Sequence, residues 1–304
     1  MNRSYRSCHA GLLVTACLAG GGRCALAQNT PGDAPPPKPN FFQRLQAQRI
    51  TLRRDISGPL SDEAAAFSFL NTKGEGTVFS ADFALRKGFR PVTRRFTTFS
   101  PVLSLEGHVS SDDSESEDAW RLRVSSEIDA PLGRRSSYYA LLSLKFEGDR
   151  DLDTQKLIGE FLFTPTVFRS FLGQAYPTTH DKPNAPIRFR LRPIAVIEAG
   201  RTLKKGGSAE ADDTVLRLLL RAKGEVFLPG VARSLGIEDA FLYANNALYH
   251  LPLEDEDRTH NFLVTGIEFR FSEFVSLGLT YKNGESAPNF NKIETFGGTI
   301  GLRF

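Results

Sequence analysis

The sequence predicts an all-β fold: a transmembrane, antiparallel, up-and-down β-barrel of about twelve strands. The first observation is that apolar and polar residues alternate with a period of two from about residue 64 to residue 304. The second is that many of these segments match the ~9–11 residues that a tilted strand needs to cross a bilayer. The third is a mean hydropathy of −0.25, too polar for a helical membrane protein but compatible with strands whose two faces differ.

The individual strands are read from this alternation. A clear case is the segment 187–197, which alternates Ile187, Phe189 and Leu191 with Arg188, Arg190 and Arg192. A soluble sandwich would bury its apolar face, whereas a membrane barrel turns that face to lipid and encloses the charged one. We expect strands at 64–71, 76–87, 98–110, 117–129, 136–148, 155–166, 186–199, 214–227, 239–250, 259–271, 274–282 and 292–304.

Residues 1–27 are predicted to be a secretory signal peptide. Arg3 and Arg6 precede a short apolar run at 10–18, and the small-x-small site at 25–27 predicts cleavage after Ala27. The sequence before Cys17 resembles a lipoprotein signal, but too few apolar residues precede it. The leader also contains every cysteine and enough arginine to explain the formal net charge of +3. The exported chain is therefore expected to be neutral, with no disulfide, thiolate metal site or nucleic-acid partner.

Residues 28–63 are expected to be a linker followed by a basic segment. The stretch 33–39 is rich in proline, which is typical of an extended linker. The following segment, 41–60, mixes arginines with apolar residues and could be a short amphipathic helix, a strand or a plug. As a periplasmic segment it would lie outside the barrel; as a plug it could pair with Glu127, Glu160 or Glu225 in the lumen.

The last strand is the most specific feature of the sequence. Residues 296–304 alternate apolar and polar side chains and end on an aromatic residue. This strand resembles the C-terminal strand of Gram-negative outer-membrane β-barrel proteins, and the resemblance is to that class as a whole. It implies residence in the cell outer membrane, contact with outer-membrane lipid and lipopolysaccharide, and recognition by the barrel assembly machinery. The residues implied as the assembly signal are Phe296, Ile300, Leu302 and Phe304.

In such barrels both termini face the periplasm, so the connections alternate between the two sides. The expected outer loops are acidic, with Asp112, Asp113, Glu115, Glu117, Asp118, Asp149, Asp151, Asp153, Glu254, Asp255, Glu256 and Asp257. The expected periplasmic turns are basic, with Lys87, Arg90, Arg94, Arg95, Arg134, Arg135, Arg169 and Arg233. These charges are either ordinary solvated faces or functional: the acidic rim would then gather divalent cations that bridge lipopolysaccharide, or repel anions at a pore mouth. The long stretch 168–185 is either a real periplasmic excursion or a slip in the strand count.

The polar face of the strands predicts a charged lumen. The lumen-lining candidates are Arg121, Arg123, Arg188, Arg190, Arg192, Arg217, Arg221, Glu127, Glu160, Glu225 and Glu268. The same register turns Arg86, Lys145, Lys223, Arg270, Asp82, Glu106, Glu147 and Glu198 inward. A water-filled pore uses such residues for selectivity, and a closed barrel uses them as a salt-bridged filling.

No catalytic residue, metal site or cofactor is predicted. His108 and Ser110 form an H-x-S pair of the kind found in outer-membrane lipid hydrolases, but here they face the lumen. The facing strand, 120–128, offers no orienting acid except Glu127, so the pair is interpreted as a chance match. His250 and His260 are expected opposite each other across a hairpin, without a third firm metal ligand.

The predicted function is a narrow passive channel for small polar solutes, with the arginine rows favouring anionic ones. The alternative is an occluded barrel with a structural or lipid-modifying, hydrolytic role. No oligomeric state follows from the sequence.

Overall fold

The computed structural model describes residues 41–53, 64–72, 76–111, 119–149, 151–179, 181–182, 184–205, 214–254, 258–285, 290 and 292–303. The predicted signal peptide, the proline-rich linker and Phe304 therefore lie outside the described residues. The same holds for the expected acidic loop residues at 112–118 and 255–257.

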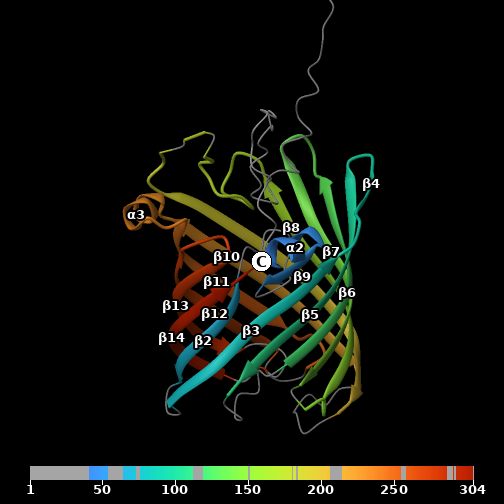
Figure 1. Ribbon diagram of the computed structural model, residues 1–304. Helices are drawn as coiled ribbons and strands as arrows, with labels where there is room; N and C mark the ends of the chain where they lie inside the picture. The colour runs from blue at the N-terminus through green and yellow to red at the C-terminus, as the bar shows by residue number, and fades with distance from the viewer. Residues whose placement is uncertain are drawn as a thin grey trace, which may run out of the picture. The chain divides into compact units, whose positions relative to one another are not determined.

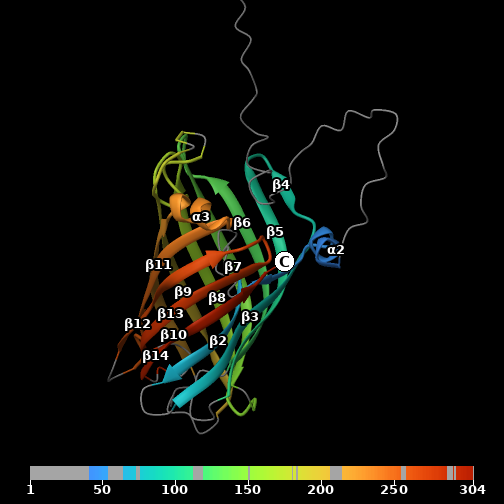
Figure 2. The ribbon, with the colours of Figure 1, turned by 60° about the vertical axis from the view of Figure 1, so that its left-hand side comes forward.

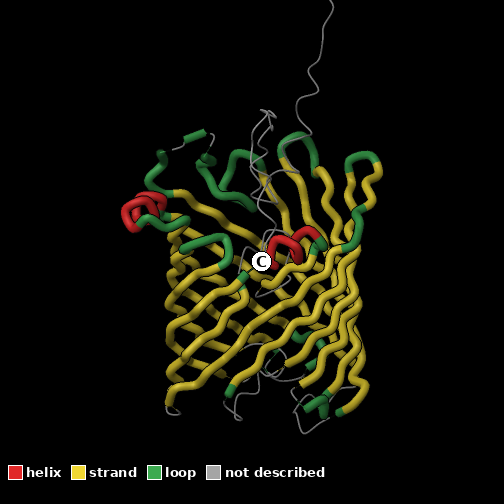
Figure 3. The backbone as a smooth tube through the Cα atoms, viewed as in Figure 1, coloured by secondary structure: helices red, strands yellow, loops and turns green. Residues whose placement is uncertain are grey.

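Twelve long strands close into one antiparallel barrel (Figures 1 and 3). Each strand pairs with its neighbour in the chain, and the ring closes where the last strand pairs with the first, for example Thr299 with Ser68. The predicted up-and-down barrel is confirmed. The strands are β2 (Ala65–Thr72), β3 (Gly76–Gly88), β5 (Thr97–Ser110), β6 (Ala119–Pro131), β7 (Ser136–Asp149), β8 (Gln155–Val167), β9 (Arg188–Lys204), β10 (Thr214–Phe227), β11 (Asp239–His250), β12 (Thr259–Arg270), β13 (Val275–Glu285) and β14 (Lys292–Leu302).

Among the described residues, four short elements accompany the barrel. They are α2 (Phe41–Ala47), β1 (Ile50–Arg53), β4 (Val92–Arg94) and α3 (Pro229–Leu235). Strand β1 pairs with the last part of β3, Ile50 with Lys87, beyond the part of β3 that pairs with β2. It therefore continues the wall where β2 is absent, and Figures 1 and 2 place α2 outside that wall. Among the described residues, no helix is long and apolar enough to cross a membrane.

The two faces of the wall have opposite chemistry. On β6, Leu122 and Val124 are 48% and 60% exposed on the outside, whereas the intervening Arg123 is only 6% exposed. The same contrast recurs on β7, where Leu144 is exposed and Lys145 is buried. A soluble protein would reverse this arrangement, because exposing an apolar belt to water costs free energy. The belt is therefore the surface that contacts membrane lipid.

The segment 168–187 is a real excursion, and the strand count does not slip there. Strands β8 and β9 pair only from Gln155–Lys204 to Phe163–Ala195 and then separate. Residues 171–176 fill the gap: the Tyr176 N–H donates to the Phe189 carbonyl at 2.8 Å, and the Gly173 N–H donates to the Leu191 carbonyl at 2.7 Å. The excursion thus supplies hydrogen-bond partners to backbone groups of β9 that β8 leaves open.

The charges expected in turns and loops separate to the two ends of the barrel. The end that carries α3, β4 and the last strand residues is called the terminal end (Figure 1). All the basic residues expected in periplasmic turns lie at or near it. The described acidic residues Asp149, Asp151, Asp153 and Glu254 lie at the opposite end.

Candidate site in the barrel lumen

The inward positions of six neighbouring strands, β5 to β10, carry a dense set of charged side chains. Every lumen-lining candidate from the sequence is buried or half-buried. Those at the centre contact one another from strands that are not neighbours, which is possible only if they point into the barrel. Ten of the candidates lie on β6 to β10, namely Arg121, Arg123, Arg188, Arg190, Arg192, Arg217, Arg221, Glu127, Glu160 and Glu225. Glu268 lies on β12, where it pairs with Arg270 of the same strand.

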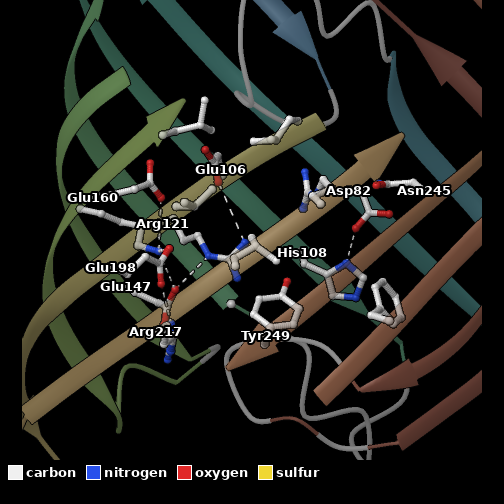
Figure 4. A pocket seen from close by; sticks show the side chains of 18 of the residues that line it. Asp82, Glu106, His108, Arg121, Glu147, Glu160, Glu198, Arg217, Asn245 and Tyr249 are labelled. Carbon is white, nitrogen blue, oxygen red and sulfur yellow. Dashed lines mark hydrogen bonds and ion pairs between the residues drawn. The ribbon is translucent and has the colours of Figure 1, made fainter. Parts of the chain in front are cut away.

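The centre of this set is a network around Arg217 of β10, which is 1% exposed (Figure 4). Its Nη1 donates to Glu147 of β7 and to Glu198 of β9, each at 3.2 Å. Lys145 Nζ donates to Glu198 at 2.6 Å and lies 3.4 Å from Glu147. Arg121 of β6 donates to Glu147 at 3.1 Å. Three cations therefore hold one buried carboxylate, Glu147, which compensates the cost of removing it from water.

The network continues toward β5 through Arg123. This guanidinium contacts Glu106 and donates to Glu160 at 3.1 Å. The Ser143 hydroxyl donates to the other oxygen of Glu160 at 3.0 Å. Lys145, 3.8 Å from Glu160, links this part to the centre. The charges thus form one connected network rather than isolated pairs.

A second cluster surrounds Glu225 nearer the terminal end. Arg190 and Arg192 of β9 donate to this carboxylate at 2.9 Å and 3.0 Å, and Lys223 Nζ lies 3.3 Å from it. The Arg190 guanidinium also lies 5.0 Å from the centre of the Phe227 ring, within cation–π range. This cluster combines three cations with one carboxylate and so carries a surplus of positive charge.

The plug hypothesis for the basic segment is not supported by its described part. The carboxylates that it named are paired within the barrel: Glu127 contacts Arg86, and Glu160 and Glu225 contact the cations given above. Residues 50–53 form β1 in the wall, and the Arg49 guanidinium donates to the Phe89 carbonyl at 2.7 Å. Residues 54–63 lie outside the described part of the chain.

A cavity of about 250 Å³ lies between this charged wall and strands β11 to β13. Its other side carries mainly neutral side chains, among them Tyr243, Asn245, Tyr249, Phe262 and Val264, together with Lys282 of β13. The wall formed by β2, β13 and β14 carries small hydroxyl residues. The Thr280 hydroxyl forms hydrogen bonds with the Tyr243 hydroxyl at 2.8 Å and with the Thr299 hydroxyl at 3.1 Å. The lumen is therefore crowded on one side and open on the other, with room for a small solute.

His108 has a partner that the sequence reading missed. Its Nδ1 contacts a carboxylate oxygen of Asp82, and Lys282 Nζ lies 3.6 Å from the other oxygen (Figure 4). Asp82 lies on β3, the strand before β5, where it is opposite His108 in register. The strand 120–128, which was expected to supply any orienting acid, is the other neighbour of β5. A carboxylate that orients an imidazole can support acid–base chemistry. Ser110, two residues on, is buried on the same side of β5.

The expectation that His250 and His260 lie opposite each other is wrong. His250 pairs with Thr259, and His260 pairs with Tyr249, so the hairpin is offset by one residue. Because strand side chains alternate, this offset sends the two rings to opposite faces. His260 contacts Glu285 at 2.6 Å and stacks on Phe290. Within the described ranges, no group of three or more His, Cys, Asp or Glu residues could hold a metal ion.

Comparisons with known proteins find only distant structural similarity. No protein-family model and no curated protein sequence matches the chain. Among solved structures, LpxR from Salmonella typhimurium is 9% identical with a TM-score of 0.41, covering 79% of this chain and 99% of that one. The NanC porin is 6% identical with a TM-score of 0.40, over 78% and 98%. OmpT of Vibrio cholerae is 7% identical with a TM-score of 0.39, over 84% and 97%.

These resemblances concern architecture alone, since neither identity nor TM-score reaches a level that transfers a function. The class itself rests on the chain's own features: a closed antiparallel ring, a lipid-facing belt and a charged interior. The chain folds as a transmembrane, antiparallel β-barrel.

Proposed function

We propose that this barrel is a narrow passive channel for small anionic solutes. The observation that carries the proposal is the surplus of cations around the lumen. Arg190, Arg192 and Lys223 surround the single carboxylate of Glu225. Arg221 lines the cavity in addition to the balanced central network and to the pair of Lys282 with Asp82. Fixed positive charge in a low-dielectric enclosure lowers the free energy of an entering anion and raises that of a cation.

The two walls of the lumen suit this role. The ion-pair network holds its arginines in place, because a guanidinium bonded to two carboxylates cannot swing across the lumen. The opposite wall offers the hydroxyl groups of Ser68, Thr280 and Thr299, which replace part of a solute's hydration shell without adding charge. A small anion would pass between a charged wall with a surplus of cations and a mainly neutral wall that carries hydroxyl groups and Lys282.

Ion selectivity tests the proposal. In planar bilayers under a salt gradient, the protein should show discrete conductance and a reversal potential on the anion-selective side. Arg221→Gln removes one cavity-lining cation and should move that potential toward zero. Arg201→Gln removes the same charge from an exposed position on β9 and should leave it unchanged. Cation selectivity of the unmodified protein would reject the proposal.

Truncation tests whether the N-terminal segment blocks the lumen. A chain lacking residues 28–48 keeps Arg49 and β1, so the pairing of β1 with β3 is preserved. We expect its single-channel conductance to equal that of the full exported chain, because the carboxylates that a plug would engage are already paired within the barrel. Conductance that appears only after truncation would show that the segment is a plug.

A second candidate function is favoured by the contact between Asp82 and His108. An occluded barrel with a hydrolytic, lipid-modifying role would use this imidazole as its base. Absence of conductance by correctly folded protein in planar bilayers would contradict the channel proposal. Loss of a lipid-hydrolysing activity on Asp82→Asn would then support the second candidate.

Export and assembly complete the proposal. Residues 1–27 direct secretion and are removed after Ala27, and the alternating terminal strand is read by the barrel assembly machinery. The acidic residues opposite the terminal end then face the lipopolysaccharide side of the membrane. N-terminal sequencing of the protein from outer-membrane fractions would reveal the cleavage site.

A further inference from the structure

A groove of about 800 Å³ lies on the outer face of the barrel toward the terminal end, and its lining is almost entirely apolar. It exists because outward side chains are small where three strands lie side by side. Gly224 of β10 pairs with Ala244 of β11, which pairs with Thr265 of β12. Larger residues such as Leu242 border this hollow.

Residues of the excursion form one side wall of the groove. Phe171, Tyr176 and Pro177 of the excursion line it together with Phe189 of β9. Three backbone hydrogen bonds attach this wall to β9: Tyr176 to Phe189 at 2.8 Å, Phe189 to Tyr176 at 2.9 Å, and Leu191 to the Phe171 carbonyl at 2.7 Å. These bonds make the wall part of the sheet rather than a loop lying against it.

The groove is continuous with the surface that contacts lipid. Phe171 and Phe189 are each 51% exposed, and Leu242 is 44% exposed, in the same outward belt. Aromatic side chains at a barrel end are typical of the membrane interface. What enters a hollow in this belt is therefore hydrocarbon, and the acyl chain of a lipid matches the apolar lining of the groove.

Positive charge lies beside the groove at the terminal end. Arg169 is exposed and stands two residues before Phe171. Exposed Arg135 comes next to it, because the Phe168 N–H donates to the Arg135 carbonyl at 2.9 Å. Guanidinium groups bind phosphate with charge-assisted hydrogen bonds. We propose that the groove holds an acyl chain of one glycerophospholipid whose phosphate contacts Arg169 and Arg135.

Native mass spectrometry of the folded, full exported chain tests this proposal. The protein is taken from vesicles of phosphatidylethanolamine and phosphatidylglycerol into detergent, and retained lipid is counted. We expect one retained phospholipid per barrel. Ala244→Phe fills the groove and should lower the bound fraction roughly tenfold. Ala222→Phe adds the same side chain at an exposed outward alanine that does not line the groove and should retain the lipid.

The role of the two arginines is tested by measuring lipid retention in variants that lack their charge. Arg169→Gln with Arg135→Gln should lower retention, whereas Arg94→Gln, at an exposed position on β4, should not. Heat-modifiable gel migration identifies folded barrels before each measurement.

Equal retention by Ala244→Phe and Ala222→Phe, or no retained lipid in the unmodified protein, would overturn the proposal. Displacement of phospholipid by added lipopolysaccharide at this groove would overturn the choice of occupant. Channel conductance of Ala244→Phe should be unchanged, so this test is independent of the proposed function.

Discussion

Replacing Arg217 with methionine should lower the stability of the folded barrel by about 3–5 kcal/mol, the usual cost of removing one partner from a buried ion pair. Arg217 and Glu147 are 1% and 2% exposed, so water cannot replace the lost guanidinium. Glu198 loses a 3.2 Å partner at the same time. The variant should lose its folded, heat-modifiable form at a clearly lower temperature.

The control for this variant is Arg201→Met, at an exposed position on β9. It removes the same guanidinium group without leaving a buried carboxylate unpaired. It should leave the transition temperature close to that of the unmodified protein. A double change, Arg217→Met with Glu147→Gln, should recover part of the lost stability, because one of the two stranded charges is removed as well. Equal transition temperatures for Arg217→Met and Arg201→Met would show that the network contributes little.

The second large effect is expected at Gly266, and Gly266→Val should prevent most of the protein from reaching the folded barrel. A Cβ atom at this position would overlap the Leu279 carbonyl oxygen of β13 and lie 2.8 Å from the Tyr243 hydroxyl. Accommodating it requires the backbones of β12 and β13 to separate, at a cost of about 3 kcal/mol or more, the upper end for overpacking.

The control is Gly298→Val on β14, where a Cβ atom would meet nothing within 4 Å. Folded protein in outer-membrane fractions, measured by heat-modifiable migration and protease resistance, should fall sharply for Gly266→Val only. If both variants assemble equally well, the close approach at Gly266 is not a constraint on the fold.

Part of the candidate site could be predicted from local sequence patterns, and part of it could not. The inward set on β9 was predictable, because Arg188, Arg190 and Arg192 alternate with apolar residues in one continuous run. The contact of Asp82 with His108 was not, because it depends on how β3 is shifted along β5. The same reason explains the error at His250 and His260, where a one-residue offset reversed a face.

The fold class, the approximate limits of the strands and the inward or outward face of most strand residues follow from the sequence alone. They do so because a period of two is a local property: in a barrel with lipid outside, the lipid-facing positions must be apolar, whereas the inward positions can carry charge. The tertiary structure alone decided which inward charges meet, as when Arg217 reaches Glu147 across strands that are not neighbours. It also decided that residues 171–176 complete the wall beside β9. Those contacts depend on register and on the curvature of the closed sheet, which arise from all strands together and leave no periodic signal in any one segment.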